Sequence, residues 1–184
     1  MKDNKKREEL LQFLSEWHPN NVAHLNWQNE FEGNGNVWAF GYISSYKDGA
    51  DSLVDIAIDG AKDILVFSIV FSYRHYLELI LKHIYLLQDE QGYKTNLQKI
   101  SHNLDKLFEK VKPLIENKHK KDYIDLLSEA VAYFDTIDRN SYNFRYVSDK
   151  KNNQSISPDF KAVNLVNLKK LMDTIDDGLY DYYA

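Results

Sequence analysis

The chain has 184 residues, the length of one ordinary domain, and its 43% hydrophobic and 28% charged content is typical of a folded protein. A net charge of −5 argues against sequence-independent binding to a phosphate backbone as the main activity, because that activity needs a basic excess. The sequence has no cysteine, which excludes disulfides, thiolate nucleophiles and cysteine-based zinc sites and predicts a cytoplasmic protein.

Two segments bear on secretion and on membrane contact. Residues 1–17 are charged and contain no apolar stretch of the signal-peptide type. The longest apolar run, residues 64–73, is interrupted by Ser68 and Ser72 and is too short to cross a bilayer. We therefore expect no membrane contact, and we interpret the apolar run as part of a buried core helix.

Residues 1–47 are predicted to form an N-terminal cap helix followed by an aromatic-rich loop. In residues 3–16, leucines and a phenylalanine at helical spacing follow a charged first turn, which indicates a short amphipathic helix. Residues 18–46 lack helical periodicity until about Val37. Their aromatic rings fit either the stacking of nucleobases or closure of the core, and the lack of interleaved Lys and Arg favours the core.

Residues 48–182 carry the stronger helical signal. The spacing predicts helices over 48–58 and 61–88, with a cap or a kink at Gly60 between them. Gly92 is predicted to end the second of these, the central helix. Few breakers interrupt the chain, which has seven glycines and three prolines, and this favours long helices over a β-fold.

The remaining elements are predicted from the same signals. Ser101 or Asn103 is expected to cap the next helix, and Pro113 to break or bend it. The later segments are a helix over 118–138, a polar loop or short hairpin over 139–159, and a last helix over 162–182. We therefore expect a single all-α domain, an antiparallel up-and-down bundle of about five or six helices.

The first candidate site lies on the central helix. Arg74, Glu78 and Lys82 recur every four residues and share one face, with His75 beside them. They form either a solvent-facing stripe of ion pairs or a covered cluster that needs partners or a ligand. The first half of this helix is apolar nearly all round, so we expect other helices to surround it, and this favours the covered cluster.

The second candidate is residues 138–146, at the end of a long helix. Its ligand-binding candidates are Arg139, Ser141, Arg145 and Tyr146. An arginine binds a phosphate or a carboxylate through two parallel hydrogen bonds, which suits an anionic ligand. In the alternative interpretation, Asp138 and Ser141 cap the helix end, and Arg145 pairs with a core carboxylate such as Glu78.

The third candidate is His102, which follows Ser101 at a predicted helix start. Backbone N–H groups there favour an anionic ligand, so His102 is either catalytic or structural. His75 with Glu78, or with His83, lacks further partners at the spacing of known metal sites. We therefore expect no metal and no other cofactor.

These segments carry a family likeness. The stretches YRHYLELILKHI (73–84), SHNLDKLF (101–108) and DRNSYNFRY (138–146) resemble HEPN domains of a family of bacterial proteins. The resemblance spans residues 48–182 and implies an antiparallel helical bundle that forms a homodimer. It also implies a role in toxin–antitoxin or phage-defence systems, with an antitoxin-type protein partner. Active members of this family are metal-independent ribonucleases.

The chain departs from the HEPN signature, in which an arginine, often followed by asparagine, precedes a histidine by four to six intervening residues. Arg139 and Asn140 resemble its opening, but the histidine positions hold Phe144, Arg145 and Tyr146. The usual acid–base partner is therefore missing. His75 or His102 replaces it if the fold brings either one close to Arg139 or Arg145.

Three functions remain open. The leading hypothesis is a HEPN-like protein that binds RNA or a nucleotide, with a divergent ribonuclease activity. Its catalytic candidates are His102, Arg139 and Arg145, and its substrate-binding candidates are Arg74, His75, Glu78, Ser141 and Tyr146. The alternatives are a non-catalytic dimeric interaction module with an internal polar network and a protein that binds a small anionic metabolite. The site hypotheses require the three polar segments to meet in the fold.

Overall fold

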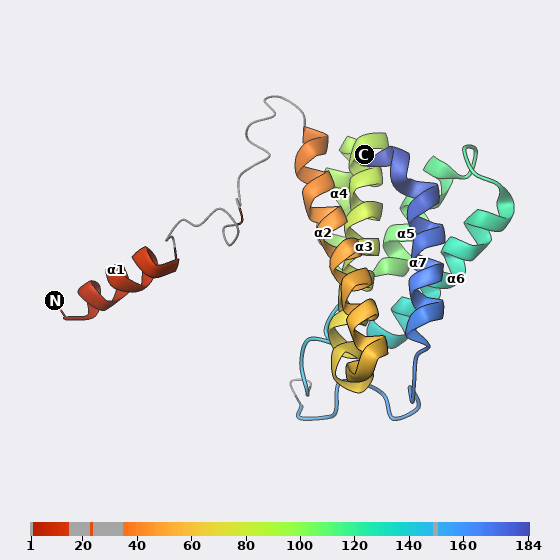
Figure 1. Cartoon of the computed structure of the whole chain (residues 1–184). Coiled ribbons are helices and arrows are strands. Elements are labelled where there is room, and N and C mark those ends of the chain that lie inside the picture. Colours follow the sequence, from red (N-terminus) through yellow and green to blue (C-terminus); the bar gives the residue numbers. More distant parts are fainter. Residues whose placement is uncertain (1, 15–22, 24–34, 149–150) are drawn as a thin grey trace. The chain divides into compact units, whose positions relative to one another are not determined.

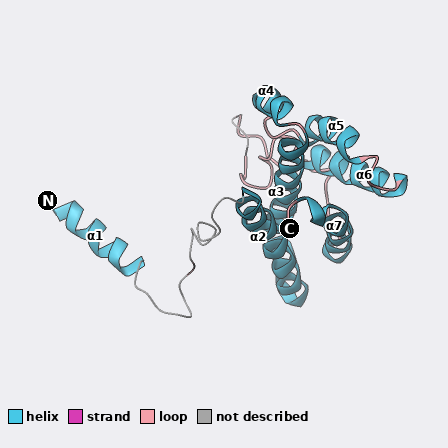
Figure 2. Cartoon of the chain, turned by 90° about the horizontal axis from the view of Figure 1, so that it is seen from above, coloured by secondary structure: helices cyan, strands magenta, loops and turns pink. Residues whose placement is uncertain are grey.

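The computed structural model describes residues 2–14, 23, 35–148 and 151–184. For residues 2–4 and 35–38 it describes the backbone alone. The regular elements of these residues are all helices, which confirms the predicted all-α bundle (Figures 1 and 2). They fall into two compact units, Met1–Gly33 and Asn34–Ala184, and each is described by itself. Within the described residues, no helix combines the length and the apolarity needed to cross a membrane.

The first unit contains one helix, α1 (Lys2–Leu14), close to the predicted range. Its leucines and Phe13 follow a run of charged residues, as expected of an amphipathic helix. Its predicted packing as a cap stays a prediction. The predicted aromatic loop covers residues 18–46, and of residues 18–34 only residue 23 is described. Residues 35–46 are helical and belong to the next helix, so the loop was predicted too long and the helix predicted to begin at residue 48 begins at Gly35.

The second unit begins with two antiparallel helices, α2 (Gly35–Ile56) and α3 (Lys62–Gln88), which pack against each other (Figure 1). One π-helical turn, Ala57–Ala61, joins them. Gly60 in that turn has a φ of 151°, a conformation that only glycine adopts readily. This is the kink that the sequence predicts at Gly60.

Helix α3 is the centre of the bundle, because α2, α4, α5 and α7 all contact it (Figure 2). Its second half is largely buried as far as Tyr85, but in its first half Ile64 is 77% exposed and Phe67 is 46% exposed. The prediction that other helices surround the first half was therefore wrong, and the run 64–73 is only partly a core segment. An apolar pattern does not show which neighbours are present, and residues 154–166 cover this half incompletely.

The prediction that Gly92 ends the central helix was also wrong. The helix ends at Gln88, because Asp89 leaves the helical conformation and begins a further helix, α4 (Glu90–Ile100). The Asp89 side chain accepts a hydrogen bond from the Gly92 N–H at 2.9 Å. A Cβ at position 92 would lie 2.0 Å from that carboxylate, so this glycine makes room for the cap of α4.

Helices α5 (Leu104–Ile115) and α6 (Lys121–Asp138) follow, and α5 packs on α3. Asn103 caps α5, since its side chain accepts a hydrogen bond from the Lys106 N–H at 2.7 Å. Pro113 does not break the helix at its own position, since α5 continues through it and ends two residues later, at Ile115.

The chain ends with α7 (Leu165–Leu179) and a short 3₁₀ turn, Tyr180–Tyr182. The segment between α6 and α7 is irregular, and an antiparallel bridge joins Ser148 to Gln154, in agreement with the predicted loop or short hairpin. Helix α7 packs against α2, α3 and α6 and so closes the bundle.

A buried lysine joins α2 to α7. Lys47 is 5% exposed, and its Nζ lies 2.6 Å from both Asp51 Oδ2 and Asp173 Oδ1. The Tyr73 hydroxyl of α3 donates to the other oxygen of Asp51 at 2.6 Å. Burial would lower the pKa of Lys47, but its hydrogen bonds to Asp173 and Asp51 raise it, so the lysine is charged at neutral pH.

Candidate functional site

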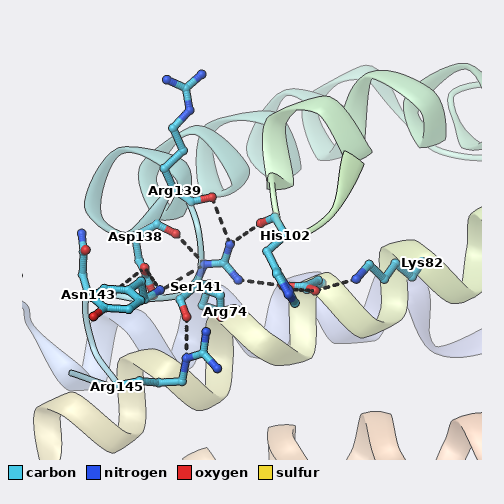
Figure 3. A network of polar contacts seen from close by, with 10 residues as sticks. Arg74, Lys82, His102, Asp138, Arg139, Ser141, Asn143 and Arg145 are labelled. Atoms are coloured by element: carbon cyan, nitrogen blue, oxygen red, sulfur yellow. Dashed lines mark hydrogen bonds and ion pairs between the residues drawn. The ribbon is translucent and has the colours of Figure 1, made fainter. Parts of the chain in front are cut away.

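Three polar segments that are distant in sequence meet at the side chain of Arg74 (Figure 3). Arg74 on α3 is fully buried. Its Nε donates to the carbonyl of Asp138 at 2.7 Å, and its Nη2 donates to the carbonyl of His102 at 2.5 Å. One arginine therefore ties α3 to the turn between α4 and α5 and to the end of α6.

Glu78 accepts hydrogen bonds from three side chains. Its Oε2 receives Arg74 Nη1 at 2.8 Å, and its Oε1 receives Lys82 Nζ at 2.6 Å and His102 Nδ1 at 2.7 Å. Glu78 is 1% exposed. Burial alone would raise its pKa, but the hydrogen bonds and charges of Lys82 and Arg74 lower the pKa to about 2. The carboxylate is therefore ionised at neutral pH, and the interpretation of a solvent-facing stripe was wrong for Arg74 and Glu78.

His102 combines a buried partner with access to solvent. Its side chain is 50% exposed, whereas the side chain of Glu78 is 2% exposed. An ionised carboxylate accepts hydrogen bonds and cannot donate one. In its neutral form the His102 imidazole therefore carries its hydrogen on Nδ1, facing Glu78. The lone pair then lies on Nε2, the form that a general base needs.

Asp138 shapes the turn after α6. Its Oδ1 accepts hydrogen bonds from the N–H groups of Tyr142 at 2.5 Å and Asn143 at 2.8 Å, and its Oδ2 lies 3.7 Å from Arg74 Nε. Ser141, buried in this turn, has a positive φ of 55°. Asp138 therefore caps the turn, as the alternative interpretation expected, and also belongs to the Arg74 cluster.

Arg145 does not pair with Glu78, in contrast to that interpretation, because Arg74 occupies the position. The Nε of Arg145 donates to the carbonyl of Ser141 at 2.5 Å. Its guanidinium lies 5.6 Å from the ring centres of both Phe71 and Tyr146. Among the described residues, no carboxylate lies within ion-pair distance of Arg145, which is exposed. These contacts orient a cation whose terminal nitrogens suit an anionic ligand.

Arg139 does not join the cluster through its side chain, which points away from Arg74 (Figure 3). That side chain is 66% exposed and lies 3.5 Å from Asp135 Oδ2. Only the Arg139 carbonyl faces Arg74, whose Nη2 lies 3.5 Å away. The structure therefore separates this predicted catalytic residue from His102.

His75 and Tyr146 lie in aromatic surroundings. The His75 ring stacks on Phe71 at 5.6 Å and meets the edge of Tyr46 at 4.4 Å. Burial lowers the pKa of His75, so it stays neutral at pH 7. Tyr146 is 51% exposed and stacks on Tyr142 at 4.5 Å.

Lys82 and Asp138 both lie in segments that the sequence marked as candidate sites, but neither was assigned a catalytic or binding role. The helical spacing of Glu78 and Lys82 predicted that they share a face, whereas the contact of Asp138 with Arg74 has no local signal. No group of three or more metal-ligating side chains occurs in the part of the chain that the structure describes. Comparisons of the chain with protein-family models, with curated proteins and with solved structures gave no match.

Proposed function

We propose that the chain is a HEPN-like RNA-binding protein that cleaves RNA without a metal, with His102 as its acid–base residue. The main observation that supports this proposal is the 2.7 Å contact between Nδ1 of the half-exposed His102 and Oε1 of the buried Glu78. A carboxylate at Nδ1 fixes the imidazole tautomer and stabilises the imidazolium that forms when Nε2 takes a proton. Glu78 is thus the positioning residue of His102.

The proposed chemistry uses the 2′-hydroxyl of the RNA as the nucleophile. Nε2 of His102 removes the hydroxyl proton, and the 2′-oxygen bonds to the adjacent phosphorus. The bond from phosphorus to the 5′-oxygen breaks, and that oxygen takes a proton from water. The hydroxide that is left takes the proton from the His102 imidazolium, which restores the neutral base. The products are a 2′,3′-cyclic phosphate and a 5′-hydroxyl end. Arg145 donates to the phosphate oxygens and stabilises the charge that develops on them.

This assignment changes the roles that the HEPN resemblance implies. His102 replaces the histidine that is missing after Arg139, and Arg145 replaces Arg139 as the cation at the phosphate. Arg74 is fully buried and donates to Glu78 and to the carbonyls of Asp138 and His102, so we assign it a positioning role and not substrate binding.

The test is cleavage of a labelled RNA by the purified full chain in the presence of EDTA, with His102→Ala compared with His119→Ala. His119 is the matched control, because its Nε2 contacts the Tyr182 hydroxyl at 3.3 Å instead of a carboxylate. We expect His102→Ala to lower the rate by about 10²–10⁴-fold. Its thermal unfolding should stay close to that of the parent, since the ring is half-exposed, and His119→Ala should cleave at the parent rate. A parent without cleavage activity, or an active His102→Ala variant, contradicts the proposal.

One observation favours a second candidate, the non-catalytic interaction module. Arg74 has no exposed surface and donates to Glu78 and to the carbonyls of Asp138 and His102, as an internal network that fixes helix positions would. In this case the parent neither binds nor cleaves RNA, and substitutions in the network change stability alone. Sedimentation of the purified chain tests the homodimer that the HEPN resemblance implies.

A further inference from the structure

A groove lies beside the first half of α3 and is lined by residues from the segment 154–166. Figure 1 shows this segment at the end of the bundle, where it leads into α7. Its volume is about 620 Å³. Its large apolar lining residues include Ile58, Val66, Phe67, Phe144, Phe160 and Val166. None of its lining residues belongs to the polar cluster around Arg74, so the groove is separate from the site of the proposed function.

The walls of the groove leave large apolar side chains in water. Ile58 is 47% exposed, Phe67 is 46% exposed and Val166 is 42% exposed, whereas Phe144 beside them is 7% exposed. Apolar side chains gathered on a surface mark binding sites. The volume lies within the range of about 300–1,000 Å³ that is usual for small-molecule pockets. A hollow of this size fits a small apolar molecule better than it fits a flat protein surface.

The charged residues that line the groove indicate the sign of the charge that a ligand there would carry. They are Lys62, Asp63 and Lys161, and none of them forms an ion pair with a described residue. Among the described lining residues, two ammonium groups and one carboxylate leave an excess of one positive charge, on a chain whose net charge is −5. This excess favours a ligand with an anionic head group and an apolar body.

We propose that this groove binds a straight-chain fatty carboxylate, with the alkyl chain along Phe67 and Ile58 and the head group at Lys62 and Lys161. Isothermal titration of the full chain with octanoate and decanoate, each below its micelle concentration, tests the alkyl chain. Each methylene buried in an apolar site should tighten binding about fourfold. Decyltrimethylammonium has the same alkyl chain and the opposite head-group charge, and it should bind several-fold more weakly than decanoate.

Matched variants locate the site. Phe67→Ala should weaken decanoate binding several-fold, whereas Leu87→Ala should leave it unchanged, since Leu87 is 45% exposed on the same helix but lies outside the groove. The double variant Lys62→Ala, Lys161→Ala should weaken the binding of decanoate but not that of decanol. Circular dichroism confirms that each variant is folded.

Three results would overturn the proposal. The first is the absence of a binding signal with decanoate, and the second is equal affinity for decanoate and decyltrimethylammonium. The third is a dimer in sedimentation that Phe67→Ala dissociates and Leu87→Ala does not, because the groove would then be covered by a second copy of the chain. None of these results bears on RNA cleavage, so this proposal and the proposed function fail independently.

Discussion

His102 and Glu78 are 24 residues apart in sequence, and His102 Nδ1 lies 2.7 Å from Glu78 Oε1. Arg74 holds both partners, because its Nη1 donates to the Glu78 carboxylate and its Nη2 donates to the His102 carbonyl. The position of the half-exposed histidine therefore depends on a fully buried arginine. Fold stability and the proposed chemistry consequently share one cluster of residues.

Replacement of Arg74 by alanine should destabilise the protein by about 3–5 kcal/mol, because the buried Glu78 and Asp138 lose a charged partner. Lys94→Ala is the matched control. Its side chain and that of its partner Glu90 are both 65% exposed, so its removal should change stability far less than the removal of Arg74 does. Urea unfolding followed by circular dichroism measures both. Equal losses of stability would show that the Arg74 cluster contributes no more than a surface pair.

Acid should weaken the fold through Glu78. The folded state lowers the pKa of Glu78 from an ordinary 4.5 to about 2 through Lys82 and Arg74, against the effect of burial. The unfolded chain therefore binds a proton more readily, and this contribution to stability is complete above pH 4.5 and lost as the pH falls toward 2. The shift corresponds to roughly 3 kcal/mol.

The variant Glu78→Gln isolates this contribution. It should be less stable than the parent at pH 7 and should lose less stability than the parent between pH 5 and pH 2. Urea unfolding at pH 7, 5, 4, 3 and 2 gives the comparison. If the two proteins lose stability in parallel over this range, Glu78 is not the titrating group.

The sequence predicted the helices where periodicity and breakers agree, as at the Gly60 kink and the Asn103 cap. It failed where two local signals competed. Gly92 is a usual helix terminator, but Asp89 ends α3 first and caps α4 through the Gly92 N–H. The apolar first half of α3 was also misjudged, because the sequence does not show how completely a loop covers a helix.

The sequence predicted which segments form the candidate site, but not all of the contacts between them. The spacing of Arg74, Glu78 and Lys82 identified one face of α3, and residues 138–146 do lie against it. The spacing of four residues predicted that Arg74 and Lys82 pair with Glu78, as they do, but the sequence left Arg145 open as another partner and did not show that Glu78 is buried. The outward direction of Arg139 likewise follows from its place at the end of α6, one residue after the buried Asp138.

Replacement of Lys47 by methionine should destabilise the fold by about 2–3 kcal/mol, because Asp51 on α2 and Asp173 on α7 lose the cation that they share. Methionine keeps the apolar volume of the lysine stem, so the loss reports mainly on charge. Lys169→Met is the control, since Lys169 forms one ion pair with Asp55, whose side chain is 65% exposed. Thermal unfolding should separate the two variants, and equal melting temperatures would contradict a structural role for Lys47.

Two glycine substitutions should change stability in opposite directions. Gly60 has a φ of 151°, and a Cβ there would meet no atom within 4 Å, so any loss in Gly60→Ala comes from backbone strain alone. We expect a loss of about 1–3 kcal/mol.

Gly49 lies inside α2, and a Cβ there also meets nothing within 4 Å. Gly49→Ala should therefore stabilise the protein by about 0.5–1 kcal/mol through helix propensity. Urea unfolding measures the free energy of unfolding of both variants. A gain in stability from Gly60→Ala would mean that the turn between α2 and α3 adopts another conformation in solution.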